Sequence, residues 1–243
     1  MIINSYQIKD ALQLKPIAPE RAGEACQSKD ARIWLDLQTA EPDEIEAWLD
    51  TLGITGLSRQ LCSETRNRSG FYPLKKEIFL VIPVLADVEG LPEVDYLAIL
   101  CRENLLLTFH RKSIFNPQQL ATLDESDNWL PERSIAGLVS AMTIDFSMEC
   151  LRHIAGLRHA IHVLEEQMDQ EPDTVEAEEI LDMRADLLVY ETVVSDQLPS
   201  LQALSATDKS FFKLKDVQDR TNRKLGMLTI LSAILRRSVM ETS

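Results

Sequence analysis

The chain has 243 residues, of which 45% are hydrophobic, and a formal net charge of −14. This length can bury a core in one large domain or two small ones, and the negative charge argues against nucleic acid as a partner. No apolar run reaches the roughly 18 to 20 residues that cross a bilayer, and the N-terminus lacks a secretory signal. The four cysteines form no C-x-x-C pair, so we expect a soluble fragment in a reducing cytoplasm with buried free thiols.

The first 125 residues have the pattern of an α+β domain. A helix is predicted at 41–53, where Pro42 lies in the first turn and Gly53 provides the stop. Pro83, in the apolar strand 77–86, predicts a bulge or a sheet edge at that point. Strands 95–101 and 105–110 flank a tight polar turn and form a hairpin. With further strands at 2–8 and 32–37, we expect a mixed, largely antiparallel sheet with helices packed on it, an α/β/α head.

After Pro117 the strand signals end, and apolar residues recur at helical spacing. Helices are predicted at 131–170 and 175–204, joined by a turn at 171–174, and a third helix at 208–243. We therefore expect three parts: an α/β head at 1–125, a helical hairpin with an acidic tip at 126–206, and a long stalk helix at 207–243.

The last of these segments looks like a helix that continues. It contains no proline and carries one apolar stripe along its length, which requires partner helices. The stripe consists of Leu214, Val217, Leu225, Leu228, Leu231 and Leu235. Because its last turns contain no Gly or Asn stop signal, we expect the protein to extend beyond Ser243.

Most of the excess negative charge lies in one stretch, which is opposed only by Arg184. Two interpretations are open. The stretch is either a solvated helical hairpin kept soluble by its charge or a surface that raises the local concentration of cations. The acidic residues are Glu165, Glu166, Asp169, Glu171, Asp173, Glu176, Glu178, Glu179, Asp182 and Asp186.

Signals for catalysis are few. The chain has no phosphate-binding glycine loop, no G-x-S-x-G string and no H-E-x-x-H string, so we do not expect an enzyme. His159 and His162 are three residues apart on one predicted helix, which allows a metal pair and hence a metal-dependent hydrolase. The alternative is that they are ordinary polar positions beside Arg158.

Several strings, taken in order, carry a family resemblance. They are 34–37 followed by the proline-started helix, the hairpin end at 107–110, the turn region 164–172, and 214–221 in the last helix. Together they resemble the cytoplasmic part of CorA-type divalent-cation transporters. The resemblance implies a homopentamer whose α/β domains form a funnel, whose last helices form a stalk, and whose acidic hairpins lie outside. The stalk would lead to membrane helices in the cell inner membrane, with this region on the cytoplasmic side.

The resemblance also implies a role and a regulatory metal site. The role is to sense intracellular metal for a transporter of Mg²⁺ or Co²⁺. The stalk aspartate of the family matches Asp216, and Asp219 lies on nearly the same helix face; such carboxylates suit hard Mg²⁺. The partner acids of a neighbouring subunit are replaced here by Gln60 and Leu61, so that Glu64 is the nearest acid.

A second branch of the superfamily remains open. The string 64–68 is similar to the Glu-x-Thr-Arg-Pro-Arg pattern of ZntB-type zinc transporters, with Asn67 in place of proline. This would make Zn²⁺ the transported ion, whereas the alternative for Arg66 and Arg68 is a loop that pairs with surface acids. A competing hypothesis from another class is a soluble scaffold that docks its last helix in a coiled coil, without transport function.

Overall fold

We analysed a computed structural model, which describes residues 2–8, 14–28, 31–38, 41–64, 67–88, 91–114, 134–171 and 177–207, together with Asn222 and Gly226. The helices in this part of the chain are α1 (Pro19–Gln27), α2 (Pro42–Thr51), α3 (Gly56–Glu64), α5 (Ile135–Gln170) and α6 (Ala177–Ser205). The strands are β1 (Ile2–Ile8), β2 (Leu14–Pro16), β3 (Arg32–Gln38), β4 (Gly70–Pro73), β5 (Ile78–Val88), β6 (Leu91–Arg102) and β7 (Leu105–His110).

The strands form one seven-stranded sheet in the order β2-β1-β3-β7-β6-β5-β4. Every neighbouring pair is antiparallel except β3 and β7, which lie parallel in the middle of the sheet with Leu35 opposite Leu107. The predicted mixed, largely antiparallel sheet is therefore confirmed. The hairpin of β6 and β7 closes with a two-residue turn between Arg102 and Leu105.

Local signals account for several element ends. Pro42 begins α2, Glu41 and Glu44 form a capping box at its start, and Gly53 follows its end with a φ of 64°, which only glycine adopts without strain. Pro83 lies in unbroken register with β6, so there is no bulge. The strand β4 pairs only with Ile78–Val81, so Pro83 lies at an edge, the second of the two predicted situations.

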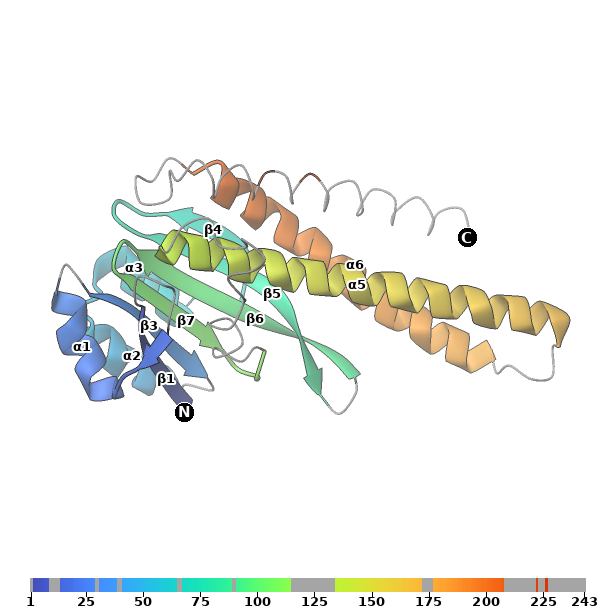
Figure 1. Ribbon diagram of the computed structural model, residues 1–243, viewed down its shortest axis with the longest axis horizontal. Coiled ribbons are helices and arrows are strands. Elements are labelled where there is room, and N and C mark those ends of the chain that lie inside the picture. Colours follow the sequence, from blue (N-terminus) through green and yellow to red (C-terminus); the bar gives the residue numbers. More distant parts are fainter. Residues whose placement is uncertain are drawn as a thin grey trace.

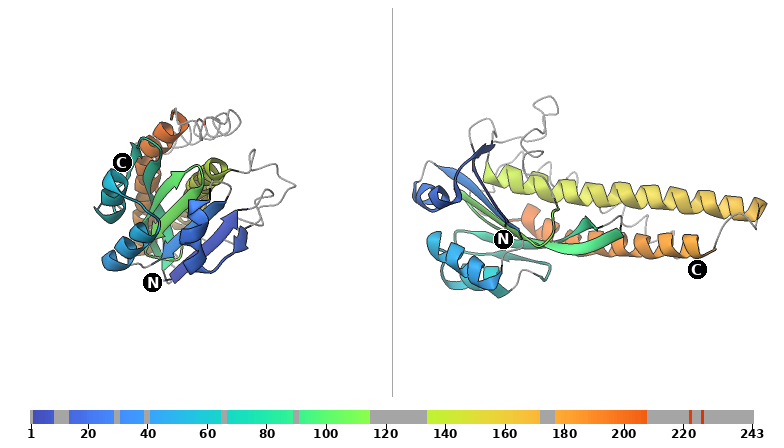
Figure 2. Two further views of the ribbon diagram at one scale, coloured as in Figure 1. Left: turned by 90° about the vertical axis from the view of Figure 1, so that its left-hand side faces the viewer. Right: turned by 90° about the horizontal axis from the view of Figure 1, so that it is seen from below.

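Helices cover both faces of the sheet. The face shared with α1, α2 and α3 buries the apolar side chains of β3, including Ile33, Leu35 and Leu37. The opposite face carries Trp34 and packs against the first third of α5, from Ile135 to Phe146. Figure 2 shows α5 on one side of the sheet and the blue helices on the other. The result is the expected α/β/α arrangement. Four short elements within it were not predicted: α1, α3, β2 and β4.

The helices α5 and α6 form an antiparallel hairpin that extends beyond the sheet (Figure 1). Their shared core includes Leu151, Ile154, Leu187 and Val193. At its start α5 is capped by the Ser134 hydroxyl, which accepts a hydrogen bond from the Gly137 backbone N–H at 3.0 Å. The two helices agree with the predicted segments 131–170 and 175–204.

The predicted stalk helix at 207–243 lies almost wholly outside the described residues. Since α5 shares a core with the sheet, the head and the start of the hairpin pack as neighbours. The division into three parts remains a prediction. No helix among the described residues is long and apolar enough to cross a membrane.

Candidate functional site

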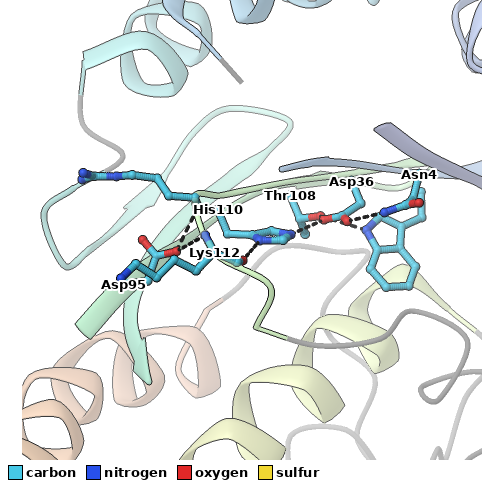
Figure 3. Close-up of polar contacts among 8 residues, drawn as sticks. Asn4, Asp36, Asp95, Thr108, His110 and Lys112 are labelled. Carbon is cyan, nitrogen blue, oxygen red and sulfur yellow. Dashed lines mark hydrogen bonds and ion pairs between the residues drawn. The ribbon is translucent and has the colours of Figure 1, made fainter. Parts of the chain in front are cut away.

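A buried polar network crosses the parallel strands β3 and β7 (Figure 3). Asp36 lies directly opposite Thr108 in the register, and His110 is two residues further along β7. The His110 Nε2 atom is 3.0 Å from Asp36 Oδ1, and the Thr108 hydroxyl donates to the same oxygen at 2.6 Å. Asp36 is 1% exposed and His110 6%, so this carboxylate and imidazole are shielded from bulk water.

The contacts of His110 favour its protonated form. Its Nδ1 atom lies 2.5 Å from the Lys112 carbonyl oxygen, which can only accept a hydrogen bond, while Nε2 faces the Asp36 carboxylate. Burial by itself lowers the pKa of His110. The hydrogen bond and negative charge of Asp36, aided by the Lys112 carbonyl and the charge of Asp95, outweigh burial and raise that pKa above its ordinary value. A hydrogen on each ring nitrogen satisfies both contacts, and the raised pKa favours this imidazolium form beside the Asp36 carboxylate.

The other contacts of Asp36 complete the network. Asn4 on β1 donates to Asp36 Oδ2 at 3.2 Å, and the Trp34 indole N–H donates to the Thr108 hydroxyl at 3.0 Å. Within the described residues, both oxygens of Asp36 accept hydrogen bonds and the carboxylate is buried, which favours a structural role over metal or substrate binding. We conclude that this network is a structural clamp between β1, β3 and β7.

Asp95 on β6 continues the clamp into the segment after β7. Its carboxylate accepts hydrogen bonds from the backbone N–H groups of Arg111 and Lys112, at 2.9 and 2.8 Å. These bonds hold the Lys112 carbonyl against His110. The position of the chain as it leaves the sheet is therefore set by two buried acids, Asp36 and Asp95.

The predicted metal ligands are only partly within the described residues. Asp216 and Asp219 lie outside them, and so does Arg66. Glu64, the last residue of α3, is exposed and accepts a hydrogen bond from Gln60 Nε2 at 3.0 Å. Leu61 is buried against the sheet. Within the described residues, no group of three His, Cys, Asp or Glu side chains lies close enough to hold a metal ion.

The described acidic residues of the hairpin lie near its tip, far from the sheet (Figure 1). On α5, Glu165 pairs with Arg184 at 2.5 Å and Glu166 lies 3.4 Å from His162. The side chains of Asp169, Glu171, Glu178 and Glu179 are exposed, whereas Asp173 and Glu176 lie outside the described residues. The structure thus brings carboxylates from both helices to one end of the molecule and compensates some of their charge.

The histidines of α5 do not form a metal pair with a third ligand among the described residues. His153 stacks on Tyr190 with ring centroids 5.4 Å apart. His162 faces Glu166, and His159 is exposed. These contacts favour the interpretation of ordinary polar positions over a metal-dependent hydrolase.

Sequence reasoning missed the clamp of Asp36 and His110. One signal was present: Asp36 is the only charged residue between Ile33 and Leu37, and the other residues of this run are apolar. A buried acid needs hydrogen-bond or charge partners, so its position called for a search for them. His110, at the end of another apolar strand, was the available cation.

Comparison with known proteins gives one family and one fold. The model of the CorA-like Mg²⁺ transporter protein family matches residues 29–239. No curated protein sequence matches the chain. The complete CorA magnesium transporter from Methanocaldococcus jannaschii is similar in structure, with a TM-score of 0.72 and 16% identity over 99% of this chain and 75% of that one.

Two further solved structures have the same fold. The full-length CmaX protein has a TM-score of 0.74 and 12% identity, over 97% of this chain and 75% of that one. The ZntB cytoplasmic domain from Vibrio parahaemolyticus has a TM-score of 0.56 and 12% identity, over 98% and 96%. The family match spans most of the sequence, and the chain therefore belongs to the CorA-like Mg²⁺ transporter family.

Proposed function

We propose that the chain is the cytoplasmic, metal-sensing part of a homopentameric CorA-like transporter for Mg²⁺ or Co²⁺. The observation that carries this proposal is the family match over residues 29–239, which includes the segment with Asp216 and Asp219. A similar solved structure supports it too. The soluble domain of CorA from Methanocaldococcus jannaschii is similar over 99% of this chain and 94% of that domain, with a TM-score of 0.72 and 17% identity.

In this proposal the head at 1–125 contributes to a funnel, the hairpin at 126–206 lies outside it, and the segment 207–243 forms the stalk towards the membrane helices. Divalent metal bound between subunits neutralises facing carboxylates and holds the subunits together. When the metal leaves, the like charges repel one another and the subunits separate. The domain therefore regulates transport without catalysing a reaction.

The ligands in this proposal are Asp216 and Asp219 of one subunit, with Glu64 as the acid nearest to them from another. Hard Mg²⁺ binds oxygen ligands and often keeps several waters, so a few carboxylates suffice. The exposure of Glu64 supports this role, although its hydrogen bond from Gln60 has to break or rearrange when a metal binds. The exposed acids of the hairpin tip would raise the local concentration of cations.

Zn²⁺ is the second candidate ion. The string 64–68 favours it through its similarity to the ZntB pattern. In the described part of this string, Arg68 is exposed and lies just before β4. A Zn²⁺ response larger than the Mg²⁺ response would select this branch.

The proposal is tested by the effect of metal on thermal unfolding. Mg²⁺ or Co²⁺ should raise the melting temperature of the chain, because a ligand that binds only the folded state stabilises it. Asp216→Ala should weaken this effect, and Glu24→Gln, which changes an exposed acid on α1, should leave it unchanged. A melting temperature that rises equally in Asp216→Ala would contradict the role of this residue.

The gene itself separates transport from the scaffold hypothesis. Reading the codons beyond Ser243 should reveal two apolar spans of roughly 20 residues each, the length that crosses a bilayer. A stop codon directly after Ser243 would instead favour a soluble scaffold. If the spans are present, electron microscopy of the full-length product counts its subunits.

A further inference from the structure

A pocket of about 580 Å³ lies between the segment that enters β4 and the C-terminal half of α6. Its walls include Arg68 and Phe71 on one side, Asp196 and Ser200 on the other, and Tyr96 from β6. The volume falls within the range of about 300–1,000 Å³ that is usual for sites of small molecules. None of these residues belongs to the buried clamp or to the proposed metal site.

Hydrogen bonds hold the two walls in place. The Ser69 hydroxyl donates to the backbone carbonyl of Asp196 at 2.9 Å, and Gln197 Nε2 donates to the Pro83 carbonyl at 2.7 Å. Gly70 allows the Tyr72 ring to lie close to the backbone, since a Cβ atom at this position would be 2.8 Å from the ring. The pocket is therefore formed before any ligand binds.

Two opposite charges share this pocket without compensating each other. The Arg68 guanidinium and the Asp196 carboxylate are both exposed and both line the pocket. Among the described residues neither side chain has an ion-pair or hydrogen-bond partner, and the two do not pair with each other. A single ligand with one anionic and one cationic group would satisfy both.

A third polar group adds to this arrangement. Ser200 lines the pocket and is 3% exposed. Its hydroxyl can donate to or accept from a ligand that enters between the two charges. Phe71 and Tyr96 add apolar surface for the carbon atoms of the ligand.

We infer that the pocket binds a small zwitterion that carries a carboxylate and an ammonium group. A guanidinium binds a carboxylate through two parallel hydrogen bonds, which assigns the anionic end to Arg68. The carboxylate of Asp196 accepts hydrogen bonds from the ammonium end. A simple anion would leave Asp196 without a partner, and a simple cation would leave Arg68 without one, so neither fits the pair of charges.

The test uses ω-amino acids of increasing length, from glycine through β-alanine and γ-aminobutyrate to 5-aminopentanoate. Titration calorimetry of the 243-residue chain with each compound, up to about 10 mM, covers weak affinities of the millimolar range. We expect one chain length to bind better than its neighbours, because only one separation of the charged groups matches that of Arg68 and Asp196. Acetate and ethylamine, which carry one charge each, should bind at least about tenfold more weakly.

Variants locate the binding. Arg68→Ala and Asp196→Asn should each weaken it about tenfold or more, whereas Arg152→Ala and Asp182→Asn, which change exposed charges on α5 and α6, should not. The exchange Arg68→Asp with Asp196→Arg should restore binding, because a zwitterion can bind in the reverse direction. Absence of binding by every compound, acetate binding as tight as the best zwitterion, or unchanged binding in Arg68→Ala and Asp196→Asn would overturn the inference.

Discussion

The clamp of Asp36 and His110 makes a quantitative prediction about stability. His110→Ala leaves a carboxylate that is 1% exposed without its imidazolium partner and removes the donor to the Lys112 carbonyl. Removing one partner of a buried ion pair costs about 3–5 kcal/mol of unfolding free energy. Because Asp36 keeps its hydrogen bonds from Thr108 and Asn4, we expect the lower end, about 3 kcal/mol, in urea unfolding at neutral or slightly acidic pH.

The pH dependence tests the charge of the pair. The pKa of His110 is raised in the folded state, since Asp36 and the Lys112 carbonyl outweigh the opposing effect of burial. The contribution of the pair is therefore fully present below the unfolded pKa of about 6.5 and is lost as the pH rises through the folded pKa. The difference in unfolding free energy between the original chain and His110→Ala should become smaller over that interval.

An exposed histidine provides the control. His159 lies on the surface of α5, and His159→Ala should change the unfolding free energy by less than about 0.5 kcal/mol at any pH. If His110→Ala costs no more than His159→Ala, or if its cost stays constant or grows from about pH 6 to about pH 9, the assignment of a buried charged pair is refuted.

Three further predictions concern the packing of helices and sheet. Gln197→Leu removes the donor to the Pro83 carbonyl and the acceptor of the Ser147 hydroxyl. Thermal unfolding should therefore show a loss of about 1–3 kcal/mol of unfolding free energy. A smaller loss in a variant that remains folded would argue against these two hydrogen bonds of Gln197. Arg184→Ala breaks the exposed ion pair with Glu165 and should cost less than about 1 kcal/mol of unfolding free energy, with a smaller effect at high salt. A larger cost in 1 M salt, about ten times the usual ionic strength, would contradict this prediction. The four thiols should react with Ellman's reagent only after unfolding in urea, because all are buried. Burial also raises the pKa of Cys26 to about 11 and those of Cys101 and Cys150 to about 12, which disfavours the reactive thiolate. Rapid labelling of the folded chain would contradict this prediction.

The sequence alone predicted the elements whose signals are local. Two apolar runs separated by a short polar turn define the hairpin of β6 and β7, and Pro42 with Gly53 bounds α2. Apolar residues at helical spacing predict α5 and α6 to within a few residues at most ends. The short elements α1, α3, β2 and β4 escaped prediction because three to nine residues hold too few apolar repeats to distinguish a period.

The sites were less accessible to prediction than the elements. The sequence indicates the proposed ligands Asp216, Asp219 and Glu64 by family resemblance and the hairpin acids by composition, and it reveals the family through ordered strings of residues. It does not indicate the partners of Asp36, because His110 is 74 residues away and becomes a neighbour only when β3 and β7 pair in parallel. In the same way Arg68 and Asp196 are separated by more than half the chain and meet in one pocket only after α6 packs beside β4.

The sequence by itself thus determined the classes and approximate limits of the main elements and the family, because these depend on residue type and on spacing within a few turns or one strand. Only the tertiary structure decided which charges are paired and which remain uncompensated. The physical reason is that strand register and helix packing bring together residues distant in the chain, and their charges interact strongly only once the surrounding side chains have excluded water.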